Sequence, residues 1–209
     1  MKKNLDEMTP EELGRLFPIY ISEPNPQWGK KFCAEKKLIK NIIGKEAILR
    51  IEHIGSTAVP GLPAKDTIDI LLEIKKTEIE DLIQRMENAG YHYIPKPENP
   101  QPHIMLVKGY TPEGYKGQCY HIHVRYPVIF SGDWDEIYFR DYLKAHPETA
   151  AEYAVLKNKL AADYRNDRDG YTEMKSGFIK SINELAKRQL PHKNPEYIEQ
   201  NKIKVTIQL

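Results

Sequence analysis

Apolar residues alternate or recur along the chain in patterns that predict both strands and helices. Residues 29–43 carry apolar side chains at helical spacing, which predicts one amphipathic helix. The runs AILRIEHIG and TIDILLEI predict two strands, because a Gly/Pro-rich loop, STAVPGLPAK, separates them. Residues 102–109 and 118–126 are β-rich runs joined by the turn-rich YTPEGYKG, which predicts an antiparallel hairpin. The order of these runs indicates a mixed α/β (α+β) fold.

Capping residues mark further helices between and after the strands. Thr77 with Glu80 forms a capping box for a helix that ends at Gly90. From about residue 133 the pattern becomes helical, and we expect three helices there. Their predicted starts are Asp133 with Glu136, then His146-Pro147, and then Tyr171, whose helix runs to about Leu190.

The two ends of the chain differ from the middle. Thr9-Pro10 followed by acidic residues predicts a short helix that ends before Pro18, so residues 1–17 form an N-terminal helical appendage. We predict one domain over residues 18–190 and a tail over 191–209. The tail ends in KVTIQL, whose alternation fits an added edge strand or pairing with another chain, so an oligomer is compatible with the sequence.

Composition excludes several classes of protein. With 40% hydrophobic and 29% charged residues the chain has a globular composition. The formal net charge of +1 lacks the positive excess that binds nucleic acid non-specifically. Cys33 and Cys119 have no zinc spacing, which favours a reduced intracellular protein. No run approaches the roughly 18 apolar residues of a membrane span. At the N-terminus, acidic residues interrupt the apolar run that a signal peptide would need. We therefore expect a cytoplasmic location and no membrane partner.

The loop between the first two predicted strands carries the main candidate chemistry. Gly55 directly follows a strand, so the backbone can turn sharply there, and Ser56 offers a hydroxyl and an N–H to a phosphate oxygen. Asp69 lies in the next strand, where a carboxylate can bind a divalent ion that bridges phosphates. A plain turn with a capping serine and a surface aspartate is the structural alternative.

These residues also carry a resemblance to a known family. A strand ending in Gly-Ser and followed about a dozen residues later by an aspartate resembles the signature of the nucleotidyltransferase superfamily. More narrowly, EHIGSTAVPGLPAKDTIDI resembles the hallmark of the GrpB family. The similarity continues over residues 18–185 in PNPQW, HIHV, FRDYLKAHPE, YAVLKNKLA and YTEMKSGFI. The resemblance implies a nucleotidyltransferase-like mixed β-sheet flanked by helices, with a helical C-terminal region.

The chain departs from the superfamily pattern in its acids. A second carboxylate is expected two residues after the first, and Leu71 stands there. Glu73 has the same parity but lies about 6.6 Å further along the strand. His121 and His123 occupy the segment that would supply a third acid, and both point to one face. With Asp69 they would suit Zn, Mn or Fe better than Mg. They are equally candidates for neutral hydrogen-bonding or acid/base groups, or for structural residues.

Several cationic and polar residues are candidate phosphate contacts. Arg140 and Lys175 recur inside the helical motifs and would meet phosphate charge across the site, with Lys157 as a weaker candidate. Solvated helix faces are the alternative for each. Further candidates flank the loop or adjoin the strands, namely Thr57, Lys65, His53 and His103.

Two functions fit this pattern. In the first, an enzyme transfers a nucleotidyl group from a nucleoside triphosphate to an unknown small acceptor, with Gly55 and Ser56 holding triphosphate. A divalent metal, Mg or Mn with Zn as a further option, would bind Asp69 with Glu73, His121 or His123. In the second, the chain is a non-catalytic nucleotide- or phosphate-binding module or an interaction protein that kept the pocket and lost the two-metal centre. A His/Asp-metal phosphohydrolase is a third hypothesis.

Overall fold

The structure is a computed structural model that describes residues 3–75, 79–95, 104–126 and 134–189. The predicted KVTIQL strand, the predicted caps at residues 77 and 133, and His103 lie outside these residues. The helices and strands are η1 (Leu5–Glu7), α1 (Pro10–Leu16), α2 (Trp28–Ile43), η2 (Lys45–Ala47), β1 (Ile48–Ile54), η3 (Ser56–Ala58), β2 (Thr67–Ile74), α3 (Ile79–Asn88), β3 (His92–Ile94), β4 (Ile104–Thr111), β5 (Gly114–Arg125), α4 (Asp135–Ala145), α5 (Pro147–Asp163) and α6 (Arg168–Gln189).

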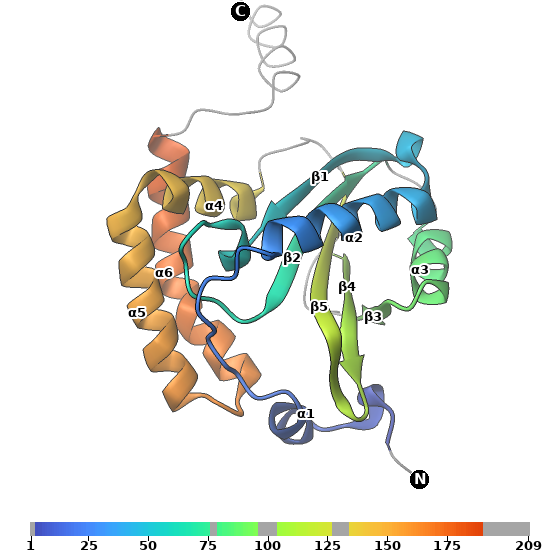
Figure 1. The fold of residues 1–209 in the computed structure, drawn as a ribbon, viewed down its shortest axis with the longest axis horizontal. Coiled ribbons are helices and arrows are strands. Elements are labelled where there is room, and N and C mark those ends of the chain that lie inside the picture. Colours follow the sequence, from blue (N-terminus) through green and yellow to red (C-terminus); the bar gives the residue numbers. More distant parts are fainter. Residues whose placement is uncertain (1–2, 76–78, 96–103, 127–133, 190–209) are drawn as a thin grey trace, which may run out of the picture.

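The strands form one mixed sheet in the order β1-β2-β5-β4-β3 (Figure 1). The pair β2 and β5 is parallel, and the other three neighbouring pairs are antiparallel. The prediction of a mixed sheet is therefore confirmed, as is the adjacency of the strands around residues 48–54, 67–74 and 119–125. The parallel pairing sets Asp69 opposite His121 and Leu71 opposite His123.

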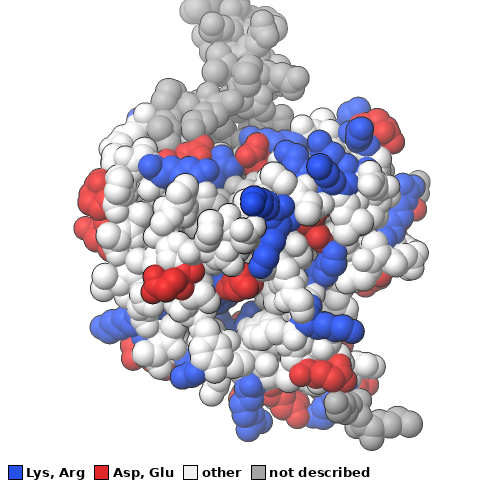
Figure 2. Space-filling view, in the orientation of Figure 1, with Lys and Arg blue, Asp and Glu red and all other residues white. Residues whose placement is uncertain are grey.

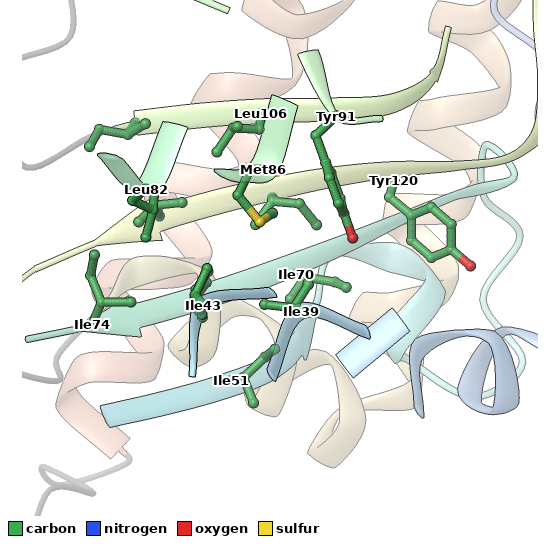
Figure 3. Packing of buried hydrophobic residues seen from close by; sticks show 14 of the residues in the cluster. Ile39, Ile43, Ile51, Ile70, Ile74, Leu82, Met86, Tyr91, Leu106 and Tyr120 are labelled. Carbon is green, nitrogen blue, oxygen red and sulfur yellow. The ribbon is translucent and has the colours of Figure 1, made fainter. Parts of the chain in front are cut away.

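Helices α2 and α3 cover one face of the sheet and bury its main apolar core (Figure 3). Alternate residues of β2, such as Ile70 and Leu72, point to this face and are fully buried. Ile39 of α2 and Met86 of α3 pack against them. Because strand side chains alternate between faces, Asp69 and Leu71 point to the opposite side. The core on one face therefore leaves the other free for polar groups.

Helices α4, α5 and α6 pack together beside the sheet, as the prediction of a helical C-terminal region requires (Figure 1). Phe139, Tyr153 and Ile182, one from each helix, share a second apolar cluster. Charged residues of both signs are interspersed over the face in Figure 2, in agreement with a net charge near zero. Within the described residues, no helix is long and apolar enough to cross a bilayer.

Two helix starts differ from the sequence prediction. Helix α4 begins at Asp135, with Trp134 as its N-cap. Helix α6 begins at Arg168, three residues before the predicted start at Tyr171. The Asp167 side chain accepts a hydrogen bond from the Gly170 backbone N–H at 2.8 Å and so satisfies a donor of the first turn. Gly170 lies in this first turn, and because glycine is a poor helix former the sequence gives little sign of the earlier start.

Burial of Met86 predicts a stability effect that a second methionine lacks. Met86→Ala should lower the free energy of unfolding by about 2–5 kcal/mol, because it leaves a cavity in a close-packed core. Met174→Ala is the matched control, since Met174 is 52% exposed on α6, and its effect should be within about 0.5 kcal/mol. Urea unfolding of both variants measures the difference. Equal effects would contradict the assignment of Met86 to the core.

Candidate functional site

The Gly55 turn brings the backbone against the carboxylate of Asp69. Gly55 follows β1 with a φ of +69°, a conformation that favours glycine. A Cβ atom added there would collide with Asp69 Oδ2. Ser56 then begins the short helix η3, and the Ala58 N–H donates to the Gly55 carbonyl at 3.2 Å. The absence of a side chain at Gly55 therefore lets the loop and the carboxylate meet.

Asp69, His121 and His123 form one cluster on the face of the sheet that is opposite to helices α2 and α3. Asp69 Oδ1 lies 3.2 Å from His121 Nδ1 and 3.4 Å from His123 Nε2. One ligand atom from each of the three residues lies within 4.8 Å of the other two. All three side chains are partly buried, with exposed fractions of 27%, 14% and 23%. Two imidazoles and one carboxylate form a donor set that fits Zn, Mn or Fe.

The protonation of the cluster follows from its hydrogen bonds. Burial alone would raise the pKa of Asp69, but hydrogen bonds from His121 and His123 outweigh it and hold that pKa well below its usual range. Burial lowers the pKa of His121 to about 4, against the attraction of Asp69. At neutral pH the carboxylate is therefore charged and the His121 imidazole neutral. Its Nε2 lies 2.8 Å from the Tyr110 hydroxyl, which completes the hydrogen bonding of the ring.

Three lysines converge near the cluster from different elements: Lys65 before β2, Lys157 on α5 and Lys175 on α6. Burial lowers the pKa of Lys65 and Lys157 to about 7 and that of Lys175 to about 8. Among the described residues, none of them forms an ion pair with a carboxylate. Lys65 and Lys175 instead lie over the ring of Tyr171, at 5.6 and 4.2 Å. The positive charges of the lysines thus repel one another in a part of the protein that is largely shielded from water.

One large cleft joins these groups. It has a volume of about 1600 Å³ and lies between the sheet, the N-terminal segment and the C-terminal helices. The predicted site residues that line it are Gly55, Ser56, Thr57, Lys65, Asp69, His121, His123, Lys157 and Lys175. A cleft with a charged cluster of this kind can hold an anionic ligand that also binds a cation.

Two predicted site residues lie elsewhere. Arg140 donates to Glu52 at 2.8 Å and to the His53 carbonyl at 2.9 Å, and it does not line the cleft. Glu73 is 3% exposed and forms an ion pair with Arg50 at 2.8 Å, so it is not part of the cluster of Asp69, His121 and His123. Strand rise explains this separation, because a residue four positions along lies beyond ligand distance. We therefore correct the expectation that either residue serves the site.

Two other positions that the sequence analysis considered, Leu71 and His53, pack against other side chains of the fold. Leu71, at the place of the expected second acid, is fully buried against Ile54 and Ile137. His53 points to the other face, stacks on Phe32 with ring centroids 4.9 Å apart and contacts the Thr57 hydroxyl at 3.0 Å. Within the described residues the cluster therefore has one carboxylate.

The sequence pattern missed several aromatic and cationic residues of the cleft. Tyr110, Tyr153, Tyr171 and Arg168 line it. The tyrosines of the helices follow the same helical spacing as core residues, so nothing in the pattern distinguishes them. Tyr110 lies in the hairpin segment YTPEGYKG, whose Pro and Gly residues predict a turn, so the pattern does not indicate a site residue there. Only the fold shows that this segment folds back onto His121.

Comparisons with known proteins agree with these landmarks. A family model described as "GrpB protein" matches residues 18–185. UPF0157 protein YqkA of Bacillus subtilis is 37% identical over 165 residues, which cover 78% of this chain and 46% of that protein. The chain thus spans less than half the length of this relative. The Glutamate-rich protein GrpB of Alkalihalophilus pseudofirmus is 34% identical, over 78% of this chain and 93% of that one. The crystal structure of GrpB from Enterococcus faecalis superposes with a TM-score of 0.70 at 33% identity, covering 81% of this chain and 98% of that one.

The contact between Gly55 and Asp69 predicts a difference between two glycine variants. Gly61→Ala should cost about 1–2 kcal/mol, because φ is +76° there and no atom lies within 4 Å of an added Cβ. Gly55→Ala adds a collision with Asp69 to the same backbone strain, so it should cost more and displace the carboxylate. Thermal melts of both variants measure this. Equal losses of stability would show that Asp69 does not restrain the turn.

Proposed function

The chain belongs to the GrpB family, and from that premise we propose that it binds a nucleoside triphosphate with a divalent metal and transfers the nucleotidyl group to a small acceptor. One observation carries the proposal. A carboxylate–imidazole cluster and three lysines that form no ion pair within the described residues share one cleft, behind a Gly-Ser turn. A triphosphate with its cation suits both parts of the cleft, because the cluster would bind the cation and the lysines would bind the phosphates.

The donor set would hold the metal through Asp69, His121 and His123. A bound divalent ion would neutralise phosphate charge and lower the pKa of an acceptor hydroxyl. For His121 to bind through Nδ1, its proton must be on Nε2, and the Nε2–H can then donate a hydrogen bond to the Tyr110 hydroxyl oxygen. Tyr110 therefore fits either tautomer of the ring. This supports a role for it in orienting His121.

The lysines would act on the phosphates. In nucleotidyl transfer an acceptor oxygen forms a bond to the α-phosphorus while the bond to pyrophosphate breaks, so negative charge grows on the leaving group. Lys65, Lys157 and Lys175 would stabilise that charge, together with the backbone N–H and hydroxyl of Ser56. Because the three lysines are already buried and repel one another, a bound anion would reduce that electrostatic repulsion. Preorganised cations of this kind need little rearrangement in the reaction.

A second candidate function is nucleotide binding without catalysis. The specific observation is Leu71, which packs in the core where the superfamily pattern would place a second metal-binding acid. With one carboxylate, the described cluster supports one metal ion rather than two. Release of pyrophosphate from a bound nucleoside triphosphate distinguishes the two functions, because only the enzyme produces it.

Asp69→Asn should abolish manganese-dependent nucleotide binding and leave the fold nearly as stable. The amide keeps the size and one acceptor oxygen but removes the charge that holds a divalent ion. His121 is neutral at pH 7, so the amide can keep its hydrogen bond to that ring, and only the attraction between Asp69 and the lysines Lys65 and Lys175 is lost. Calorimetric titration of Mn-ATP into both proteins, beside thermal melts, measures the two effects.

The control for this variant is Asp66→Asn, the same change three residues earlier. Asp66 accepts from the Trp28 indole at 2.6 Å and does not line the cleft. Mn-ATP affinity should stay within about twofold, an energy below 0.5 kcal/mol. Unchanged binding in Asp69→Asn, or absence of binding in the native protein, would contradict the proposed function.

The lowered lysine pKa values predict proton uptake on anion binding. At pH 8 Lys65, Lys157 and Lys175 are partly neutral, with pKa values of about 7, 7 and 8, and a bound anion should raise those values. Binding of inorganic triphosphate should therefore take up protons at pH 8, and this lysine uptake should vanish at pH 6, where the groups are already charged. Titration calorimetry in buffers of different ionisation enthalpy measures it.

The matched pair for this test lies on one helix. Lys157→Met removes a buried lysine of the cleft, whereas Lys159→Met changes an exposed one. The first should reduce the proton uptake at pH 8 and the second should not. Proton release at pH 8, or equal uptake in both variants, would show that the lysines do not meet the anion.

A further inference from the structure

The lining of the cleft becomes apolar on the side of the sheet away from the lysines. In the register of β4 and β5, His121 lies opposite Val107, and His123 lies opposite Met105. In the next pair Met105 lies opposite Ile94 of β3. These three apolar residues line the cleft. Since directly paired strand residues have Cβ atoms about 4.5–5.5 Å apart, an apolar surface begins immediately beside the two histidines.

The N-terminal segment supplies the facing wall. Leu5, Met8 and Leu13 line the same cleft and are only half-buried, as is Met105 on the sheet. These residues come before the range that matches the GrpB family model, which starts at residue 18. The wall therefore lies outside the range that the family model matches.

Specific contacts hold this segment in place, and Figure 1 shows its helix α1 near the tip of the β4–β5 hairpin. Asp6 Oδ1 lies within hydrogen-bond distance of His92 Nε2, at 2.9 Å, and Phe17 packs edge-on to Tyr110 with ring centroids 5.1 Å apart. Gly14 lies so close to the turn between α5 and α6 that an added Cβ would collide with the Asn166 backbone. The apolar wall is thus anchored at three points along the segment.

The size of the cleft leaves room for a second molecule. Its volume is about 1600 Å³, whereas pockets for one small ligand typically measure about 300–1,000 Å³. The strand order β1-β2-β5-β4-β3 places the Asp69 and His121 strands between the Gly-Ser turn and the apolar surface of β4 and β3. A triphosphate on the lysines would leave the apolar half free.

We infer that this apolar half binds the apolar group of an amphiphilic small molecule whose hydroxyl or amine faces Asp69 and His121. Its occupant is the acceptor, an alcohol or amine with an aliphatic or aromatic group. The role as acceptor rests on the proposed function, whereas the apolar site itself does not. An acceptor bound this way has its nucleophile beside the metal cluster and its apolar part out of water.

Native methionines report on this site. Met8 and Met105 lie on its two walls, Met86 is buried on the opposite face of the sheet, and Met174 is exposed on α6. With ¹³C-methyl methionine labelling, titration with 1-octanol should shift the Met8 and Met105 signals saturably and leave those of Met86 and Met174 unchanged. Absence of shifts, or equal shifts of all four signals, would overturn the apolar site.

A pair of leucine variants tests the wall directly. Leu13→Asn places a polar group on the wall and should weaken octanol binding about tenfold, or about 1.4 kcal/mol. Leu49→Asn changes a leucine that is 46% exposed outside the cleft and should leave the affinity unchanged. Equal affinity in the two variants would contradict a binding role for the N-terminal wall.

The role as acceptor is tested with both probes together. Inorganic triphosphate with Mn²⁺, at a concentration shown by calorimetry to saturate the protein, should leave octanol bound and the Met8 and Met105 shifts intact. Loss of those shifts would show competition for one place and overturn the two-ligand arrangement. Absence of triphosphate binding would instead refute the proposed function and the acceptor role, while the octanol shifts would still establish the apolar site.

Discussion

Asp69 lies on an interior strand of the sheet, and an ionised carboxylate in such a place must be hydrogen-bonded or it destabilises the fold. The surrounding structure meets that constraint. The parallel strand β5 places His121 opposite it, and His123 follows on the same face. Gly55 has no side chain, so the preceding turn can approach the carboxylate. The site therefore depends on how one charge is accommodated.

The three lysines of the cleft add a second electrostatic constraint, although Asp69 attracts Lys65 and Lys175. Lys65, Lys157 and Lys175 are buried with lowered pKa values, so charging them carries an electrostatic cost. The apolar core on the other face of the sheet does not depend on the cleft and offsets that cost. Functional sites commonly retain groups that destabilise the protein alone and are relieved by a ligand. An anion would be that ligand here.

Much of the architecture could be predicted from local patterns. Strand alternation placed His121 and His123 on one face, and the Gly-Ser turn before the Asp69 strand identified the centre of the cluster. Partner choice could not be predicted, because the sequence does not show that Arg140 pairs with Glu52 or that Glu73 pairs with Arg50. The role of the N-terminal segment was equally hidden, since a short amphipathic helix gives no sign of what it packs against.

The central claim is that one cleft brings a metal cluster and a triphosphate site together. A crystal structure with Mn²⁺ and a non-hydrolysable nucleoside triphosphate, using the anomalous scattering of manganese, tests it most directly. The account predicts an anomalous peak bounded by Asp69, His121 and His123, with the phosphates between that peak and Lys65, Lys157 and Lys175. A peak elsewhere, or phosphates bound away from the three lysines, would contradict it.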